Sequence, residues 1–474
     1  MIQNGKSLAL VTVAVAVIGA CALVYILLEL FIDCYNYPGG PRVNYPTPAN
    51  ALEAREQDLA YFRHYLALDR SYSVESRRAA LRLLQVLQPN LASLSDAAFQ
   101  LGIARAVAAA DNGHSNVWFG RFSRQHGRLP LRFYWFSDGP VVVRAREDLG
   151  ELLGARLLAI GDTPLDQASA ALQQFVGGSI EGFRAYRGAV LLELPAAHAA
   201  ADLGDSETQT RLTLLLADGR LVTRVIDAET LAGDWPLFWS QSYLFARPPE
   251  LEPDPWTGLA ARIGDLPLYL REPARQFRVA DLPGNGLYLQ YRDNFSDGIE
   301  AFNQGVRQRI AARPPDYLVV DQRMNGGGDY TLTAGLMADL PGLVGAESPV
   351  YVLTGNSTFS AGINSVAFLE AAAPERVTIV GERIGDRERA YGETNDFELP
   401  NSRMGMTFST GLHDLANGCP PVPQCYYLNY FFDVAVGRLD PDIAVPTTVA
   451  DYLAGRDPVL EAVLADRALS VRAQ

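Results

Sequence analysis

Lysine is almost absent from this chain of 474 residues: Lys6 is the only one, and all other residues in the Lys and Arg total are arginines. A lysine amine therefore cannot act in catalysis beyond residue 6, and arginine cannot replace it because arginine does not lose its proton in proteins. Cations are also outnumbered, with 40 Lys and Arg against 54 Asp and Glu and a formal net charge of −14. Nucleic-acid binding needs clustered cations, so we expect no DNA or RNA partner.

Cysteine is scarce as well, with four in the chain. Cys21 lies in an apolar stretch and Cys34 just beyond it, whereas Cys419 and Cys425 flank a proline-rich loop. The last pair predicts a small disulfide in an oxidising compartment. The alternative is a zinc site, but no second Cys or His pair has the spacing for one. We expect no metal and no cofactor.

One long hydrophobic run lies near the N-terminus, from Leu8 to Leu28 with Thr12 as the polar exception. About 20 apolar residues can cross the hydrocarbon core as a helix. We therefore expect a cytoplasmic tail at 1–6 and a transmembrane signal anchor at 7–32.

The stretch Ile18-Gly19-Ala20-Cys21 also resembles a lipoprotein cleavage box, but the mostly apolar residues after Cys21 favour an uncleaved anchor. Because Lys6 precedes the span, the positive-inside rule predicts a single-pass protein of the cell inner membrane. Its bulk would face the periplasm or the exterior. The prolines that follow predict a linker at 33–50.

Three regions are expected beyond the linker. Apolar residues at helical spacing and a break at Pro89-Asn90 predict a helical domain with the first strands over 51–134. The stretch 135–230 reads as a β-rich module, with a hairpin signal at Asp218-Gly219. Its segment GARLLAIGDTPLDQA resembles PDZ domains, which implies capture of a peptide C-terminus by strand addition.

The remaining region, 231–474, alternates strands and helices from Gly286 onwards. Short apolar runs such as Tyr317 to Val320 are typical of strands buried in a parallel sheet. The chain is therefore expected to be an α/β protein.

Two of these strand ends carry candidate chemistry. The first is followed by DQRMNGGGD, where glycines leave backbone N–H groups uncovered and able to bind negative charge. The second is followed by GNSTFSAG, which places Ser360 between a strand and a helix. There the N–H of Ala361 and the helix dipole would stabilise an oxyanion formed by attack of the Ser360 hydroxyl. The alternative is that Ser360 only caps the helix.

The pair DQRMNGGGD and NSTFSAG resembles the tail-specific, or C-terminal-processing, serine proteases, and the resemblance covers nearly everything beyond the anchor. It implies a crotonase-like mixed sheet core and a PDZ-like module. It also implies that Ser360 is the nucleophile and that Gly327, Gly328 and Ala361 form the oxyanion hole.

A serine nucleophile needs a base. One branch of the family uses a lysine after the nucleophile helix, but residues 381–386 contain none. A histidine is then expected, and the sequence has five: His64, His114, His126, His198 and His413. His114, in DNGHS, resembles the DGH element of the tricorn-like branch and is favoured; His413 is the second choice.

The third catalytic residue is less clear from the sequence, because the glutamate that the tricorn-like branch places near Pro-Asp-Ile has no match here. Glu393 is expected in its place, with Asp433 as the alternative. The sequence therefore predicts a membrane-anchored serine peptidase that acts on peptides or proteins. A catalytically inactive ligand- or peptide-binding protein on the same fold is the alternative. The oligomeric state stays open.

Overall fold

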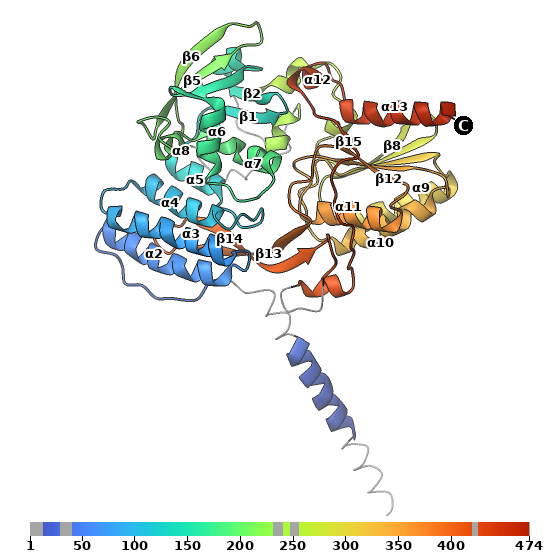
Figure 1. The fold of residues 1–474 in the computed structure, drawn as a ribbon, viewed down its shortest axis with the longest axis horizontal. Coiled ribbons are helices and arrows are strands. Elements are labelled where there is room, and N and C mark those ends of the chain that lie inside the picture. The colour runs from blue at the N-terminus through green and yellow to red at the C-terminus, as the bar shows by residue number, and fades with distance from the viewer. Residues whose placement is uncertain (1–12, 29–39, 231–239, 247–255, 420–424, 474) are drawn as a thin grey trace, which may run out of the picture.

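The computed structural model describes residues 13–28, 40–230, 240–246, 256–419 and 425–473 (Figure 1). Three helices open the body of the chain, as the sequence predicts: α2 (Ala51–Leu68), α3 (Val74–Leu87) and α4 (Asp96–Ala108). Each begins at a capping side chain, because Asn50, Ser73 and Ser95 accept the backbone N–H three residues further on. Helix α5 (Phe119–His126) leads into the first sheet.

The first sheet has the strand order β1-β2-β3-β5-β6, with β4 on β3 and β7 on β2. Helices α6, α7 and α8 are inserted between its strands. The bounds are β1 (Leu131–Phe136), β2 (Gly139–Arg146), β3 (Arg156–Ile160), β4 (Thr163–Pro164), α6 (Leu165–Gln173), α7 (Glu181–Gly188), α8 (Pro195–Ala200), β5 (Gln209–Leu215), β6 (Leu221–Asp227) and β7 (Trp256–Gly258). The hairpin expected at Asp218-Gly219 joins β5 to β6.

Strand β1 is an edge strand, and a buried carboxylate lies against its open side. Glu193 is fully buried and accepts the Phe133 N–H at 2.8 Å and the Arg128 Nε–H at 2.6 Å. Burial raises the pKa of Glu193, and the neighbouring Arg128 and Arg132 oppose that rise. Just after β1, the Ser137 N–H donates to the Thr447 carbonyl at 3.1 Å.

The second sheet forms the core and has the order β15-β12-β11-β10-β9-β8. Strand β8 is antiparallel to β9, and all other neighbouring pairs in this sheet are parallel. Its elements, with their helices, are β8 (Phe277–Leu282), β9 (Gly286–Tyr291), α9 (Ile299–Ala312), β10 (Tyr317–Asp321), α10 (Thr331–Leu343), β11 (Val350–Thr354), α11 (Ala361–Ala372), β12 (Val377–Gly381), β15 (Ile443–Ala444), α12 (Val449–Leu453) and α13 (Pro458–Ala473). This confirms a mixed α/β fold.

Side chains of the core strands alternate between the two faces of the sheet. Leu318 and Val320 pack with residues of α9, α10 and α11, whereas Val319 packs with residues of α13. The helices therefore cover both faces, with α13 opposite α11 (Figure 1). This arrangement leaves the loops after β10 and β11 side by side at one edge of the sheet.

A hairpin of β13 (Arg389–Glu398) and β14 (Gly405–Asp414) joins the core to the N-terminal helices. The Tyr65 hydroxyl on α2 donates to the Thr407 carbonyl at 2.8 Å, and the Arg70 N–H donates to the Ser409 carbonyl at 2.9 Å. Val117 forms an isolated bridge with Met406. The hairpin thus brings the loop after α4 close to the core.

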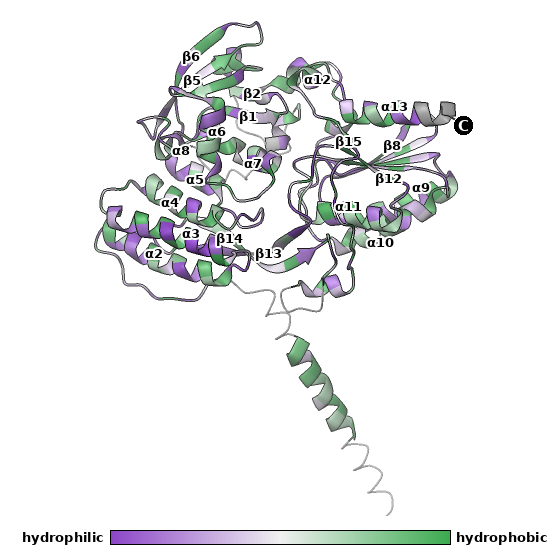
Figure 2. Ribbon diagram, viewed as in Figure 1, coloured by the Kyte–Doolittle hydropathy of each residue, from purple (hydrophilic) through white to green (hydrophobic). Residues whose placement is uncertain are grey.

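The location expected from the sequence is corrected here. Within the residues that the structure describes, no helix has both the length and the apolar character needed to cross a membrane. Inside the expected anchor at 7–32, the described helix covers residues 13–28, and Figure 2 shows it as hydrophobic along its length. The assignment to a single-pass inner-membrane protein facing the periplasm is therefore withdrawn. Cys34 lies outside the described residues.

Arg323, just beyond β10, is held between two carboxylates. Its guanidinium donates to Asp321 at 2.6 Å and to Asp457 at 2.7 Å, and it stacks 4.3 Å above the Tyr269 ring. Burial alone would lower the pKa of Arg323, but the two carboxylates outweigh burial and raise it. The start of the glycine loop is thereby fixed to the residue before α13.

The substitution Arg323→Met is therefore expected to destabilise the protein by about 3–5 kcal/mol, because two buried carboxylates lose their counter-charge. Urea unfolding followed by circular dichroism measures the change. Arg224→Ala, which removes an exposed pair with Glu151, is the control and should cost less than about 1 kcal/mol. Equal midpoints for the Arg323→Met variant and the unsubstituted protein would contradict this role.

Candidate active site

The loops after β10 and β11 are joined by hydrogen bonds from the NSTF segment. Ser357 Oγ donates to the Arg323 carbonyl at 2.5 Å, and Thr358 Oγ1 donates to the Gln322 carbonyl at 2.8 Å. The Phe359 N–H donates to the Asn325 carbonyl at 2.9 Å. The polar residues before Ser360 thus hold its loop against the glycine loop.

Glycines are required where the two loops meet. A Cβ added to Gly327 would lie 2.6 Å from the Cβ of Ser360, and one added to Gly328 would lie 2.6 Å from the Asn294 carbonyl carbon. Their φ angles are +117° and +133°, a region that side chains disfavour. The GGG motif therefore permits the backbone to lie directly against Ser360.

Ser360 has an unusual backbone conformation, with φ 53° and ψ −125°. Such conformations cost about 1–3 kcal/mol and are found mainly at functional sites. Its side chain makes no capping hydrogen bond to α11. The alternative that Ser360 merely caps the helix is therefore not what the structure shows.

Two backbone N–H groups beside Ser360 are available to an oxyanion. Among the described residues, no hydrogen-bond partner is found for the N–H of Gly328 or of Ala361, the first residue of α11. The Gly327 N–H, in contrast, donates to Asn325 Oδ1 at 3.0 Å. Of the three residues expected in the oxyanion hole, Gly328 and Ala361 can donate, while Gly327 provides the space.

His114 lies beside the serine loop. Its ring lies beside that of Phe359, with the two planes tilted by 33° and a centroid distance of 4.2 Å, and its Nδ1 lies 3.6 Å from Oδ2 of the buried Asp386. Within the described part of the chain, neither ring nitrogen of His114 has a hydrogen-bond partner. Its Nε2 is therefore free to accept a proton, and Asp386 is placed to orient the ring.

His413 is held differently. The Asn429 Nδ2–H group donates to His413 Nδ1 at 3.3 Å, while His413 Nε2 lies 3.2 Å from Glu393 Oε1. Asn429 Oδ1 accepts the Tyr330 hydroxyl, which fixes the orientation of the amide. Because Nδ1 accepts, the proton of the neutral ring lies on Nε2 and faces Glu393. His413 therefore lacks a free lone pair for a catalytic base.

Both imidazoles approach Gly392 on β13. A Cβ added there would lie 3.2 Å from His413 Nε2 and 3.8 Å from His114 Nε2. The next residue, Glu393, has φ 53°, while the register between β13 and β14 is the same on both sides of it. Its carboxylate lies beside His413 on the neighbouring strand. The structure thus pairs Glu393 with His413 and Asp386 with His114.

A single pocket brings these groups together. It has an empty volume of about 450 Å³ including its open mouth, and Ser360, His114, Asp386, Gly328, Glu393 and His413 line it with the apolar residues Tyr330, Ile363 and Leu415. The other three histidines lie elsewhere. His64 is exposed on α2, His126 ends α5, and His198 is buried, with a pKa that burial lowers to about 4.

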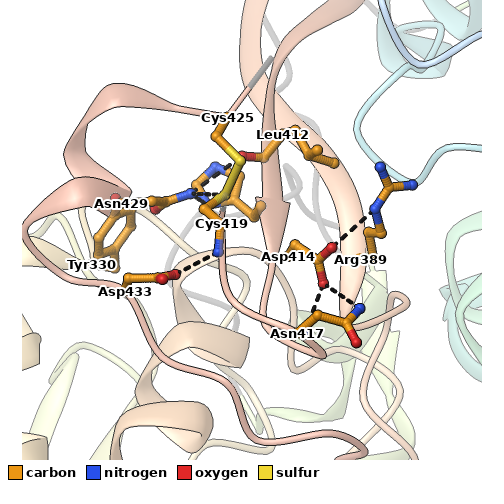
Figure 3. The surroundings of a disulfide bond; sticks show 10 residues. Tyr330, Arg389, Leu412, Asp414, Asn417, Cys419, Cys425, Asn429 and Asp433 are labelled. Atoms are coloured by element: carbon orange, nitrogen blue, oxygen red, sulfur yellow. Dashed lines mark hydrogen bonds and ion pairs between the residues drawn. A yellow bond between two sulfur atoms is a disulfide. The ribbon is translucent and has the colours of Figure 1, made fainter. Parts of the chain in front are cut away.

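The structure joins Cys419 and Cys425 in a disulfide. Figure 3 shows it next to Asn429, whose Nδ2 lies 3.5 Å from Cys419 Sγ and donates to the Leu412 carbonyl. Asp433, the alternative to Glu393, accepts the Cys419 N–H at 2.9 Å instead of contacting a histidine. The disulfide therefore supports the group that orients His413.

Asp386 is the functional candidate that the sequence reasoning missed. It lies five residues after β12, in the stretch 381–386 that we considered for a lysine. A signal was present: β12 is parallel to β11, and polar residues after adjacent parallel strands share one edge of the sheet.

Solved structures of other proteins share the architecture. Mature CPAF complexed with lactacystin has 14% sequence identity and a TM-score of 0.52, over 89% of this chain and 99% of that chain. A second structure of mature CPAF has 15% identity and a TM-score of 0.50, over 85% and 95%. The photosystem II D1 C-terminal processing protease covers 86% and 98% at 14% identity, but its TM-score of 0.33 is too low to carry an argument.

No protein-family model and no curated protein matches the sequence. At these identities the likeness establishes the fold: the chain has the fold of mature CPAF. The resemblance to the tail-specific protease superfamily is thereby confirmed as a likeness of fold.

The two carboxylates should differ in their effect on Ser360. Asp386→Asn is expected to slow the reaction of Ser360 with a small alkyl fluorophosphonate by about 100-fold or more, because His114 loses the group that orients it. Glu393→Gln should slow it far less, since Glu393 contacts His413. Labelling rates followed by mass spectrometry measure both, and the reverse order would assign the base to His413.

Proposed function

We propose that this protein is a serine peptidase of the C-terminal-processing kind, acting on peptides or proteins. The observation that carries the proposal is the strained Ser360, whose side chain does not cap α11 and which shares a pocket with His114. The ring nitrogens of His114 have no hydrogen-bond partner among the described residues. Strain of this kind is held by surrounding contacts where the side chain must be presented for reaction. The N–H groups of Gly328 and Ala361, which have no hydrogen-bond partner among the described residues, supply the matching oxyanion site.

The chemistry follows from these roles. The Ser360 hydroxyl oxygen attacks the carbonyl carbon of a peptide bond while its proton passes to His114 Nε2. The carbonyl oxygen becomes an oxyanion and accepts the N–H groups of Gly328 and Ala361. His114 then protonates the leaving amine, and the C–N bond breaks to leave an acyl-serine. A water molecule hydrolyses this ester by the same route, returning the proton to Ser360.

Asp386 acts through His114. The 3.6 Å separation from His114 Nδ1 exceeds a hydrogen bond, and such contacts in unbound sites commonly shorten when substrate binds. A positive charge on the imidazole would strengthen the contact, because Asp386 is almost completely buried. The carboxylate thus stabilises the imidazolium formed during attack.

Labelling with a fluorophosphonate and hydrolysis of fluorescein-labelled casein test the proposal together. The unsubstituted protein should be labelled at Ser360 and should hydrolyse casein, and both activities should fall by at least about 1,000-fold in Ser360→Ala and His114→Ala. His64→Ala, on the surface of α2, is the control and should leave both unchanged.

The catalytically inactive binding protein, the alternative expected from the sequence, gives a different result. It would take up no label at Ser360 and would release no fluorescent peptides from casein. Loss of both activities in His413→Ala, with both retained in His114→Ala, would keep the peptidase but overturn the assignment of its base.

A further inference from the structure

Phe295 is a large apolar side chain left exposed at the edge of the candidate active site. It lies in the loop after β9 and is 68% exposed. Single exposed apolar residues are common and need no explanation by themselves. The features that set Phe295 apart are the backbone against which its ring lies and the rigidity of the turn that carries it.

The Phe295 ring lies against Gly328. A Cβ added to Gly328 would be 2.8 Å from Phe295 Cδ1, and a Cβ added to Gly327 would be 3.1 Å from Ser360 Oγ. The Phe295 ring and the Ser360 hydroxyl thus contact consecutive residues, whose Cα atoms are about 3.8 Å apart. The ring therefore lies against the residue whose N–H group we assign to the oxyanion hole.

Hydrogen bonds fix the turn that presents Phe295. Asp293 Oδ1 accepts the N–H of Phe295 at 3.1 Å and that of Ser296 at 2.9 Å. The Asn294 N–H donates to the Gly327 carbonyl at 2.8 Å, and the Asp329 N–H donates to the Asn294 carbonyl at 3.0 Å.

The side chain of Asn294 also holds the turn in place. It is fully buried and bonded to Thr333 at 2.7 Å and to Asn325 at 2.6 Å. Phe295 is accordingly held in place without its ring being buried. A group that is held in position before binding loses little conformational entropy on contact with a ligand.

We infer that Phe295 is a substrate-binding residue, forming an apolar platform for a peptide side chain next to the scissile bond. The inference rests on the proposed peptidase function. A peptide whose carbonyl oxygen is held by the Gly328 N–H must pass the neighbouring ring, because its residues advance only about 3.3 Å each. An apolar side chain within two residues of the scissile bond would then cover the ring and remove both surfaces from water.

Casein and a small alkyl fluorophosphonate are the probes for this role. The unsubstituted protein should cleave casein preferentially where an aromatic or aliphatic residue lies within two positions of the cut, as mapped by mass spectrometry. Phe295→Ala should lose that preference, and its kcat/KM for casein should fall by about 10- to 100-fold. Labelling of Ser360 should stay within about threefold, because the small probe places no side chain on the ring.

Two further variants sharpen the comparison. Phe295→Leu should recover most of kcat/KM and the preference for apolar residues, since it restores an apolar side chain. Leu221→Ala removes a similarly exposed residue, 63% exposed on β6, and should behave like the unsubstituted protein.

The possible failures are distinguishable. No labelling and no cleavage by the unsubstituted protein would overturn the proposed peptidase and this inference with it. Normal labelling combined with unchanged rate and preference in Phe295→Ala would overturn the inference alone. A parallel loss of labelling and cleavage in Phe295→Ala would assign the ring to the integrity of the glycine loop, and would also overturn it.

Discussion

The candidate site depends on the contact between the loop after β10 and the loop after β11. Ser357 and Thr358 donate their hydroxyls to carbonyls of the glycine loop, and Phe359 donates its N–H to the Asn325 carbonyl. Arg323 anchors the beginning of the same loop through Asp321 and Asp457. Without these bonds nothing would hold Ser360 in a strained backbone conformation beside two glycines, because strain persists only where surrounding contacts over-determine it.

Much of the core could be predicted from the sequence. Short apolar runs predicted the alternation of strands and helices, and the run from Tyr317 to Val320 lies in the buried strand β10. Ser360 and Gly328 could also be identified as candidates from the sequence, because glycine and serine after a buried strand are strong local signals of a turn.

Which carboxylate contacts which histidine could not be predicted from such local signals. Glu393 has φ 53° inside β13, a conformation with no local signal in the sequence, and its partner His413 lies on the neighbouring strand β14. Asp386 lies in the loop after β12, and it contacts His114 only because this loop packs against the loop after α4. Such contacts depend on packing between distant segments, for which the residues themselves carry no local pattern. The apolar N-terminal run had a clear pattern, yet the membrane location drawn from it was wrong.

The two imidazole–carboxylate pairs in the pocket differ in how the imidazole is hydrogen-bonded. His114 keeps both nitrogens unbonded within the described chain, whereas both nitrogens of His413 are engaged, by Glu393 and by Asn429. A ring held at both nitrogens is rigid and contributes shape and polarity. The His114 ring lies beside Phe359, and its Nδ1 lies 3.6 Å from Asp386. The geometry therefore distinguishes a histidine engaged at both nitrogens from one without a hydrogen bond among the described residues, and we propose the latter as the base.

The buried carboxylate of Glu193 limits how another chain can pair with the edge strand β1 of the β-rich module. An incoming strand would need the outward N–H groups along β1 and just beyond it, but Glu193 and the Thr447 carbonyl already accept those of Phe133 and Ser137. Glu193 and the Thr447 carbonyl therefore occupy hydrogen-bonding positions that a strand added at this edge would need. A peptide that pairs with β1 would have to displace the Glu193 carboxylate, which forms ion pairs with Arg128 and Arg132.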